Sequence, residues 1–446
     1  MSRRVVITGL GCLSAAGTEI DPHRRAFHDG SDLATPERLV LGGGEWLETR
    51  VARFPEFDRG ALISPAGQRR MSLLSQNWVV ACLKARADAR LNAAQNTGFA
   101  GGVRAGRSAA QPDQAAVDAS GAPAPERTGV FLGTGFGCLQ CTAEYLDGVQ
   151  RDGLGLGSPF LFSESVANAP AGHAAIELVC RGPNLTLTCG DAAGMAAVEA
   201  GARAIRQGRA DAVYAGGAEQ MTAPLLAVLA RLGASAGTGK HEGRRWRVPG
   251  AASNAHFPGE GAACLLLEER ERALARGARP YAEVKMGAML SDPEADASGW
   301  SRSVRPRAAA LRRALECSRL SPDDVDGVLL HACGDPEADR AEAQALTGVL
   351  ESERSPGVPT LSLFSPARVV GRFAAAGALS VAAAALSLRY QEPYVDGGSA
   401  RQEGDAELSV TRLARPRGGG AREIRNILLS AASWGGSCMG LVLGRP

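Results

Sequence analysis

The chain has 446 residues, of which 45% are apolar and 22% charged, and its formal net charge is +2. These values exclude a mostly disordered or fibrous chain, and the length suits two or three domains or one large duplicated unit. The 49 basic residues are nearly balanced by 47 acidic ones and form no dense basic block, so we expect no nucleic-acid partner.

At the N-terminus, Met1-Ser-Arg-Arg leads directly into a strand-like run, Val5-Val6-Ile7-Thr8, instead of a signal sequence. No apolar stretch free of charge is long enough to cross a membrane. We therefore expect a cytoplasmic protein without a membrane partner. The ten cysteines are too sparse for a disulfide framework, and Cys138 and Cys141 form a single Cys-x-x-Cys pair with no second pair to complete a zinc site. The expectation is buried free thiols and no metal.

A helical pattern spans about 71–91 and is followed by a segment of different composition. Residues 92–127 are rich in Ala, Gly, Pro, Gln and Ser and show no apolar periodicity, which predicts a mobile surface insertion. Beyond it, short β-branched runs alternate with Ala-rich helical stretches. This alternation is typical of an α/β protein with largely buried strands.

Three strand-like segments of the first half have counterparts, in the same order, in the second half. In each half the second segment turns into an Ala-rich helix, over 192–207 and 373–388. The repeat predicts a duplicated α/β unit with an N-terminal half, 1–255, and a C-terminal half, 256–446. Chance likeness among short apolar strands is the alternative. The paired segments begin at Gly129 and Gly327, at Asn184 and Thr360, and at Asp211 and Arg425.

A glycine motif after the first strand matches a dinucleotide site only in part. Gly9-Leu-Gly11 follows the strand, but Ser14 stands where the third glycine belongs, and no helical periodicity begins there. We expect neither a dinucleotide nor any other cofactor.

The segment Gly182-Pro-Asn-Leu-Thr-Leu-Thr-Cys-Gly-Asp-Ala-Ala-Gly194 predicts a strand, a sharp turn and a helix. With five further blocks in a fixed order it resembles the β-ketoacyl synthase (condensing enzyme) family, and the likeness covers nearly the whole chain. The resemblance implies a thiolase fold, a duplicated unit with α/β/α/β/α layers and mixed five-stranded sheets. The other blocks are Arg4-Val-Val-Ile-Thr-Gly, Ser158-Pro-Phe through Ala171-Gly-His, Pro258-Gly-Glu-Gly, Asp339-Arg-Ala-Glu and Trp434-Gly-Gly-Ser.

Condensing enzymes of this family carry a nucleophilic cysteine at the start of the helix after that strand, where backbone N–H groups and the helix dipole favour a thiolate. Carried over without gaps, the resemblance places Asp191 at this position. A carboxylate there cannot form the stable acyl thioester that condensation requires. Asp191 is also a good N-cap for the helix expected over 192–207, and the two interpretations are compatible.

The family also uses two histidines, which stabilise the enolate released by decarboxylation, and a supporting lysine. The first histidine corresponds to His331, whose following loop has diverged. The second position falls on Gly371 or, with a one-residue gap, on Arg372. Because His331 is the last histidine of the chain, no alignment can restore the second one. The lysine position falls on Pro366 or Ala367, and no lysine follows Lys285.

Because it lacks the nucleophilic cysteine, the second histidine and the lysine, the chain resembles the chain length factor, or ketosynthase β subunit, of type II polyketide synthases. That resemblance implies a subunit that does not condense, pairs with an active ketosynthase α subunit and shapes the tunnel that holds the growing chain, with an acyl carrier protein as visiting partner. An arginine such as Arg372 commonly replaces the second histidine in this subfamily. Asp191 is a departure, because a glutamine is more usual there.

The same resemblance implies residues that line the acyl tunnel or the subunit interface. Ala432 stands at the position of a gating aromatic, two residues before Trp434. Ordinary core or interface packing is the alternative for each of them. The other residues are Phe136, Gly137 and Cys138, and Phe160, Leu161 and Phe162.

Two other functions stay open at this point. A divergent decarboxylase or cyclase acting on a carrier-bound acyl chain could use His331 as acid or base, and Asp191 as base if burial raised its pKa. A condensing enzyme could instead act through Cys189, but a two-residue shift moves the reacting atom by several ångströms, where about 1 Å already matters. The sequence does not specify the chain length, the starter unit or the product, nor whether the pathway makes an aromatic polyketide or a polyene.

Overall fold

The computed structural model describes residues 3–42, 45–91, 123–231, 237–241, 244–247, 257–295, 299–333, 335–350, 362–394 and 423–446. Most of the predicted insertion over 92–127 therefore lies outside the described residues, and only its end, with a 3-10 turn at Pro125–Arg127, is seen. No helix within these ranges combines the length and the apolar character needed to span a membrane.

Ten strands form one continuous sheet that consists of two sets of five. Read from its outer edge, each set has the order third, second, fourth, fifth and first strand. The sets meet where β1 pairs antiparallel with β10, Val5 opposite Val284. The first set is β1 (Val5–Leu13), β4 (Thr128–Gly133), β5 (Asn184–Leu187), β6 (Ala212–Glu219) and β9 (Gly261–Glu269). The second is β10 (Ala282–Ser291), β11 (Gly327–Leu329), β12 (Ser362–Phe364), β13 (Asn426–Ala432) and β14 (Ser437–Gly444).

The shared strand order confirms the predicted duplicated thiolase fold. The three paired segments become β4 and β11, β5 and β12, and β6 and β13, and each pair holds the same place in its set. In both sets the second strand runs parallel to the third and the fourth. The fifth strand of the first set, β9, begins at Gly261, so the pairing of the first set extends past residue 255, where the sequence suggests the division into halves.

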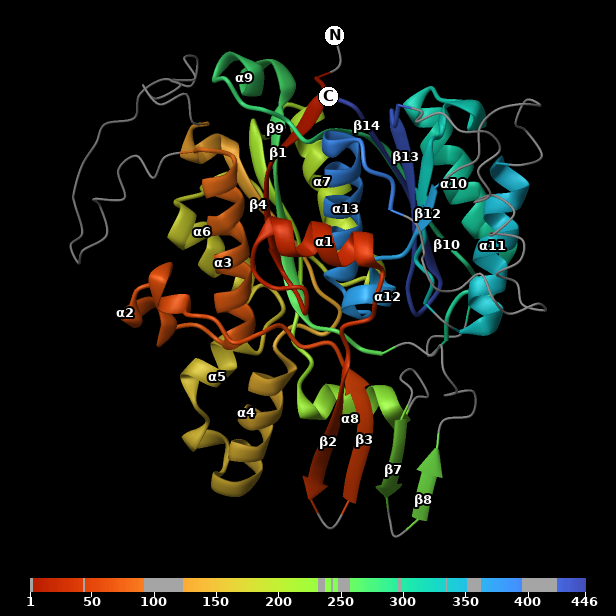
Figure 1. Cartoon of the computed structure of the whole chain (residues 1–446). Coiled ribbons are helices and arrows are strands. Elements are labelled where there is room, and N and C mark those ends of the chain that lie inside the picture. The colour runs from red at the N-terminus through yellow and green to blue at the C-terminus, as the bar shows by residue number, and fades with distance from the viewer. Residues whose placement is uncertain are drawn as a thin grey trace, which may run out of the picture.

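Helices complete the five layers (Figure 1). Two central helices, α7 and α13, lie between the two sets of strands, while α3 and α6 cover the outer face of the first set and α10 and α11 that of the second. The Ala-rich composition of α13 suits its central place, because small side chains allow close helix packing. These helices are α3 (Leu73–Asp88), α6 (Ala169–Leu178), α7 (Ala193–Arg206), α10 (Val304–Ser318), α11 (Pro336–Leu350) and α13 (Ala376–Tyr390).

A smaller sheet of four strands lies below the layers in Figure 1, beside α8. Helices α4 and α5 lie at the same end of the molecule. The strands are β2 (Thr35–Gly42), β3 (Glu45–Val51), β7 (Gly237–His241) and β8 (Arg244–Arg247). The remaining helices are α1 (Ile20–Asp29), α2 (Pro65–Gln68), α4 (Leu139–Asp152), α5 (Pro159–Glu164), α8 (Ala223–Arg231), α9 (Arg270–Ala275) and α12 (Ala367–Val370).

The glycines of β1 serve helix packing. All nine residues of β1 are buried, and a Cβ on Gly11 would lie 1.9 Å from the carbonyl oxygen of Ala81 in α3. A side chain at Gly11 would therefore push α3 off the strand. Close packing of α3 against β1 is therefore a sufficient reason for a glycine at this position, and a bound nucleotide is not needed to explain it.

The N-terminal ends of the two central helices meet at one point. A Cβ on Gly377, in the first turn of α13, would lie 3.1 Å from the carbonyl oxygen of Asp191 and 3.1 Å from the backbone nitrogen of Met195 in α7. This close approach places the turn that carries Asp191 against the start of α13. The fold therefore brings residues from both halves of the chain to Asp191.

Candidate functional site

Asp191 lies in the turn between β5 and α7. Gly190, with a φ of 58°, begins a 3-10 turn over Gly190–Ala192, and α7 itself begins at Ala193. Ala192 is the N-cap residue, and no side chain caps the helix. The prediction that Asp191 caps this helix is wrong, because the 3-10 turn delays the helix by one residue and the carboxylate pairs with Arg372 instead.

Arg372 forms a buried ion pair with Asp191. Its Nη1 lies 3.2 Å from Oδ2 of Asp191, and the two side chains are 7% and 17% exposed. The backbone of Arg372 is fixed on both sides, because its N–H donates to the carbonyl of Phe257 and its carbonyl accepts from Gly259, each at 3.1 Å. Gly371, with a φ of 79°, forms the turn before it. Of the two residues considered for the second histidine position, Arg372 is the one whose side chain reaches Asp191.

His331 approaches the same carboxylate from the loop after β11. Its Nε2 lies 3.7 Å from Oδ2 of Asp191, which is too long for a hydrogen bond. The backbone N–H groups of His331 and Ala332 donate to the carboxylate of Glu342 in α11, both at 2.9 Å. Neither ring nitrogen has a hydrogen-bond partner among the described residues. The backbone, not the ring, therefore fixes the position of His331.

The side chains of the site leave almost no space. The cavity beside Asp191 measures about 10 Å³, at most about the volume that one water molecule requires. Ala367, one of the two residues at the predicted lysine position, lines it, whereas Pro366 is the N-cap residue of α12. The lining residues are Asp191, Met195, His331, Ala367, Arg372, Ala376, Gly377, Ser380, Ser430 and Ala431.

The environment of Asp191 favours its ionised form. Burial alone would raise the pKa of Asp191, but the guanidinium of Arg372 and the imidazole of His331 outweigh burial, and the pKa lies below its ordinary value. A carboxylate of low pKa is a poor general base at neutral pH. The decarboxylase or cyclase alternative required burial to raise this pKa, and the shift goes the opposite way.

A second acid, Glu219, lies at the end of β6 close to this site and was not singled out from the sequence. It is 1% exposed, and its Oε2 accepts hydrogen bonds from the N–H groups of Gly135 at 2.6 Å and Phe136 at 3.3 Å. Its Oε1 has no partner among the described residues. Burial raises the pKa of Glu219 to about 8, and the negative charge of Asp191 adds to this shift. Glu219 is therefore mostly protonated at neutral pH, and it anchors the loop that carries Phe136.

We expect Glu219→Gln to change how stability depends on pH. The folded-state pKa of about 8 lies above the unfolded value of about 4.3, so the wild-type carboxyl contributes stability at low pH that is lost as pH rises toward 8. Glutamine does not titrate, so between about pH 5 and pH 8 the variant should lose less stability than the wild type. Urea unfolding midpoints at three pH values measure this, and parallel pH profiles for the two proteins would contradict it.

Two tryptophans lie beside the site. The chain has five tryptophans, and Trp300 and Trp434 lie here with ring centroids 5.9 Å apart. The guanidinium carbon of Arg372 lies 4.6 Å from the ring centroid of Trp300, a cation–π contact, and the ring of His331 lies 5.2 Å from it. Trp300 belongs to no recognised motif and was missed, and the scarcity of tryptophan was the one available signal. Ala432, at the predicted gating position, is fully buried at the end of β13.

The predicted tunnel residues lie on two neighbouring elements away from the small cavity. Phe136, Gly137 and Cys138 form the loop before α4, and Phe160, Leu161 and Phe162 lie on α5. The three phenylalanines are 40–58% exposed, whereas Cys138 is buried. None of the six lines the cavity beside Asp191. Their role in a tunnel stays a prediction.

Cys189 lies directly before the 3-10 turn of Asp191 and is partly buried. Burial raises the pKa of the Cys189 thiol. The reactive thiolate is therefore scarce at neutral pH, which is the reverse of what a condensing nucleophile needs.

Comparison with known proteins identifies the family. The β-ketoacyl synthase N-terminal domain family matches residues 110–273, and the C-terminal domain family matches residues 281–393. A putative polyketide β-ketoacyl synthase 2 of Streptomyces halstedii is 30% identical over 421 residues, covering 93% of this chain and 92% of that protein. The 3-oxoacyl-[acyl-carrier-protein] synthase 2 of Vibrio harveyi is 29% identical over 364 residues, covering 79% and 78%.

Two solved structures share the fold over the full length of both chains. The ishigamide ketosynthase/chain length factor matches with a TM-score of 0.78 at 23% identity. A type II polyketide synthase acyl-carrier protein in complex with its ketosynthase, AntDE:AntF, matches with a TM-score of 0.76 at 20% identity. On these matches and the duplicated fold, the chain belongs to the β-ketoacyl synthase family.

Proposed function

We propose that the chain is a non-condensing chain length factor, a ketosynthase β subunit that pairs with an active β-ketoacyl synthase and contributes wall to the tunnel of the growing acyl chain. The observation that carries this proposal is the buried ion pair between Asp191 and Arg372. It stands where the resemblance places the nucleophile and one catalytic histidine.

The chemistry of the pair supports a role without condensation on this chain. Acyl transfer needs a nucleophile that can hold the chain as a thioester and donors aimed at the developing oxyanion. Here a carboxylate of lowered pKa is neutralised by Arg372, and the cavity of about 10 Å³ has no room for an acyl group. The substitutions at the two positions compensate one another, since each charge alone would be costly to bury.

An exposed apolar surface supports pairing with another subunit. It runs over α4, α5, α6 and the edge strand β5, each of which contacts the next. Helices α4, α5 and α6 lie along one side of the molecule (Figure 1). We call this surface the α4–β5 face. Contiguous exposed apolar residues on a soluble protein typically mark an interaction site. Its large apolar residues, each at least 37% exposed, are Phe136, Leu146, Leu154, Leu156, Phe160, Phe162, Val166, Ile176, Val179 and Leu185.

We infer the partners and the pathway from the similar proteins named above. One structural neighbour is a ketosynthase/chain length factor, another is a ketosynthase in complex with its acyl-carrier protein, and the Streptomyces halstedii relative is a putative polyketide β-ketoacyl synthase. We therefore take the partner to be a ketosynthase α subunit, the visiting protein to be an acyl carrier protein, and the product to be a polyketide or polyene chain. Phe136 and Phe162, on the α4–β5 face, are the tunnel residues that such a partner would cover.

The decisive experiment is Asp191→Asn in the co-expressed pair. Asparagine keeps the shape and the acceptor oxygen for Arg372 but cannot act as a base or form an acyl anhydride. The variant should be less stable, because the guanidinium of Arg372 loses its counter-ion. At equal amounts of purified 1:1 complex, however, turnover with a carrier-bound substrate and product length should stay within about twofold of wild type. A loss of about 100-fold in turnover would instead make Asp191 a catalytic residue and overturn the proposal. Replacing the nucleophilic cysteine of the ketosynthase partner is the positive control, because it should abolish turnover.

A further inference from the structure

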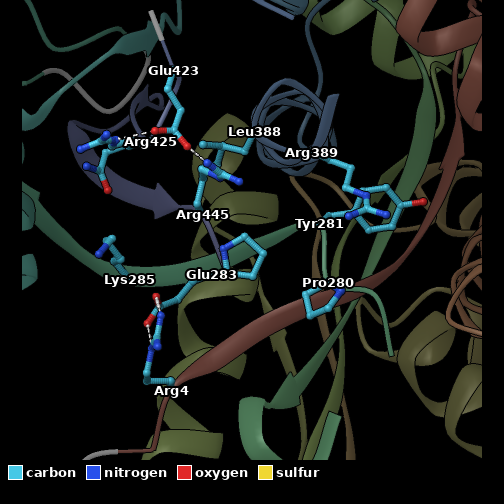
Figure 2. Close-up of a pocket in the computed structure, with 12 residues that line it drawn as sticks. Arg4, Pro280, Tyr281, Glu283, Lys285, Leu388, Arg389, Glu423, Arg425 and Arg445 are labelled. Carbon is cyan, nitrogen blue, oxygen red and sulfur yellow. Dashed lines mark hydrogen bonds and ion pairs between the residues drawn. The ribbon is translucent and has the colours of Figure 1, made fainter. Parts of the chain in front are cut away.

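We propose that a second, cationic cavity binds a small molecule with two or more linked phosphate groups. This cavity measures about 550 Å³, within the range of about 300–1,000 Å³ that is usual for small-molecule sites. Figure 2 shows charged side chains that reach it from several elements of the fold. Its lining residues are Arg4, Pro280, Tyr281, Glu283, Lys285, Leu388, Arg389, Glu423, Arg425, Asn426, Arg445 and Pro446.

The lining side chains carry a surplus of positive charge. Five are cationic and two are anionic, and three of the five cationic side chains contact the two carboxylates. Both carboxylates are already engaged, because Glu283 accepts from Nε of Arg4 at 2.9 Å, and Glu423 pairs with Arg425 at 2.9 Å and with Arg445 (Figure 2). The surplus therefore rests on groups that no internal carboxylate neutralises.

Lys285 and Arg389 are these groups. Neither has a carboxylate partner within the described ranges, although each lines the cavity. Lys285 is one of only three lysines in the chain, and its stem lies across β14, since a Cβ on Gly444 would come within 2.3 Å of its Cε. This contact holds the ammonium group of Lys285 at the cavity. Figure 2 shows Lys285 and Arg389 on different sides of the cavity, so a ligand has to span the cavity to meet both.

The chemistry of the lining favours linked phosphates. Guanidinium groups match phosphate oxygens two at a time, and an ammonium group adds a mobile point charge. A cavity of this size exceeds what a single phosphate fills, and Pro280, Tyr281 and Leu388 offer an apolar wall to an organic group joined to the phosphates. The chemical class is therefore an organic or inorganic diphosphate or triphosphate.

This cavity is separate from the site of Asp191 and independent of the proposed function. Ala376 lines the small cavity, and Arg389 lines the cationic one. They lie thirteen residues apart (389 − 376) in α13, a distance of about 20 Å along the helix. A ligand here cannot contact Asp191, so the two proposals fail or succeed separately.

Calorimetric titration of the full chain at low ionic strength tests the proposal. The probes are inorganic tripolyphosphate, ADP and citrate, and each probe titrated into buffer is the blank. We expect tripolyphosphate and ADP to bind one per chain, with an affinity that falls as salt is added. Tighter binding of ADP than of tripolyphosphate would indicate that the apolar wall contacts the organic part of the ligand. Tighter binding of tripolyphosphate would indicate that the ligand is an inorganic polyphosphate. Equal binding of citrate would overturn the assignment to phosphate.

The variant Lys285→Gln/Arg389→Gln should weaken tripolyphosphate binding at least about tenfold, because two charge-assisted contacts are lost. The matched control is Arg151→Gln/Arg313→Gln, which removes the same charge from side chains that are 72% and 64% exposed and outside the cavity. The control should bind as the wild type does. Absence of saturable binding in the wild type, or equal losses in the two variants, would overturn the proposal.

Discussion

Arg372→Leu is expected to lower the free energy of unfolding by about 3–5 kcal/mol, the usual cost of removing one partner from a buried ion pair. The reason is that Asp191 would keep a side chain only 17% exposed without the guanidinium that lies 3.2 Å away. The cation–π contact of Arg372 with Trp300 is lost as well. Urea unfolding of the wild type and the variant measures the difference, and the fluorescence of the two tryptophans at the site reports it.

The pH dependence of this difference identifies its cause. In the wild type the lowered pKa of Asp191 contributes stability above the unfolded value of about 3.9, which is lost as pH falls through the lower folded value. In the variant, burial without Arg372 raises the pKa of Asp191, so the variant loses stability as pH rises. The gap between the two proteins should therefore be wide at pH 7 and narrow toward about pH 4. A gap that does not change with pH would indicate lost packing, not an orphaned carboxylate.

Two further variants separate charge from packing. Asp191→Asn/Arg372→Leu removes both charges and should recover much of the loss, because no ion is left buried alone. Arg313→Leu is the control, since it removes an arginine that is 64% exposed and paired at the surface of α10, and should change stability by less than about 1 kcal/mol. Failure of the double variant to recover stability would contradict the ion-pair account.

The fold could be predicted well because the strand-like segments and motifs that indicate it are spread over the whole chain. Order along the chain was enough to pair β4 with β11, β5 with β12 and β6 with β13. The resemblance to the condensing enzymes grouped Asp191, His331 and either Gly371 or Arg372, and the structure brings the side chains of Asp191, His331 and Arg372 together. What each contributes to function stays a prediction.

The energetics of the site could not be predicted from the sequence, because they depend on distances. The sequence left open whether burial raises the pKa of Asp191, and in the structure Arg372 and His331 outweigh burial and lower that pKa. Trp300 and Glu219 were not predicted as site residues because each comes to the site through tertiary packing. The prediction that Asp191 caps the helix was wrong for a local reason, because a 3-10 turn over Gly190–Ala192 precedes α7 and makes Ala192 the N-cap residue.

Ile176→Lys/Leu185→Lys is expected to weaken association with the ketosynthase subunit by about 100-fold or more, corresponding to about 3 kcal/mol. Ile176 of α6 is 69% exposed and Leu185 of β5 is 38% exposed, so both lie at the surface of the isolated chain. Among the described residues β5 is also the outer strand of its set, and an edge strand can pair with another chain. A partner that covers the α4–β5 face would bury two ammonium groups without counter-ions, and that desolvation is the source of the loss.

The measurement is the dissociation constant of the pair, with urea unfolding of each variant as a check on the fold. Because both positions are exposed, the free energy of unfolding of the isolated chain should change by less than about 1 kcal/mol. Leu274→Lys is the matched control, since Leu274 is 41% exposed on α9, an element outside the α4–β5 face. An unchanged dissociation constant in the double variant, or an equal loss in the control, would place the ketosynthase interface on another surface.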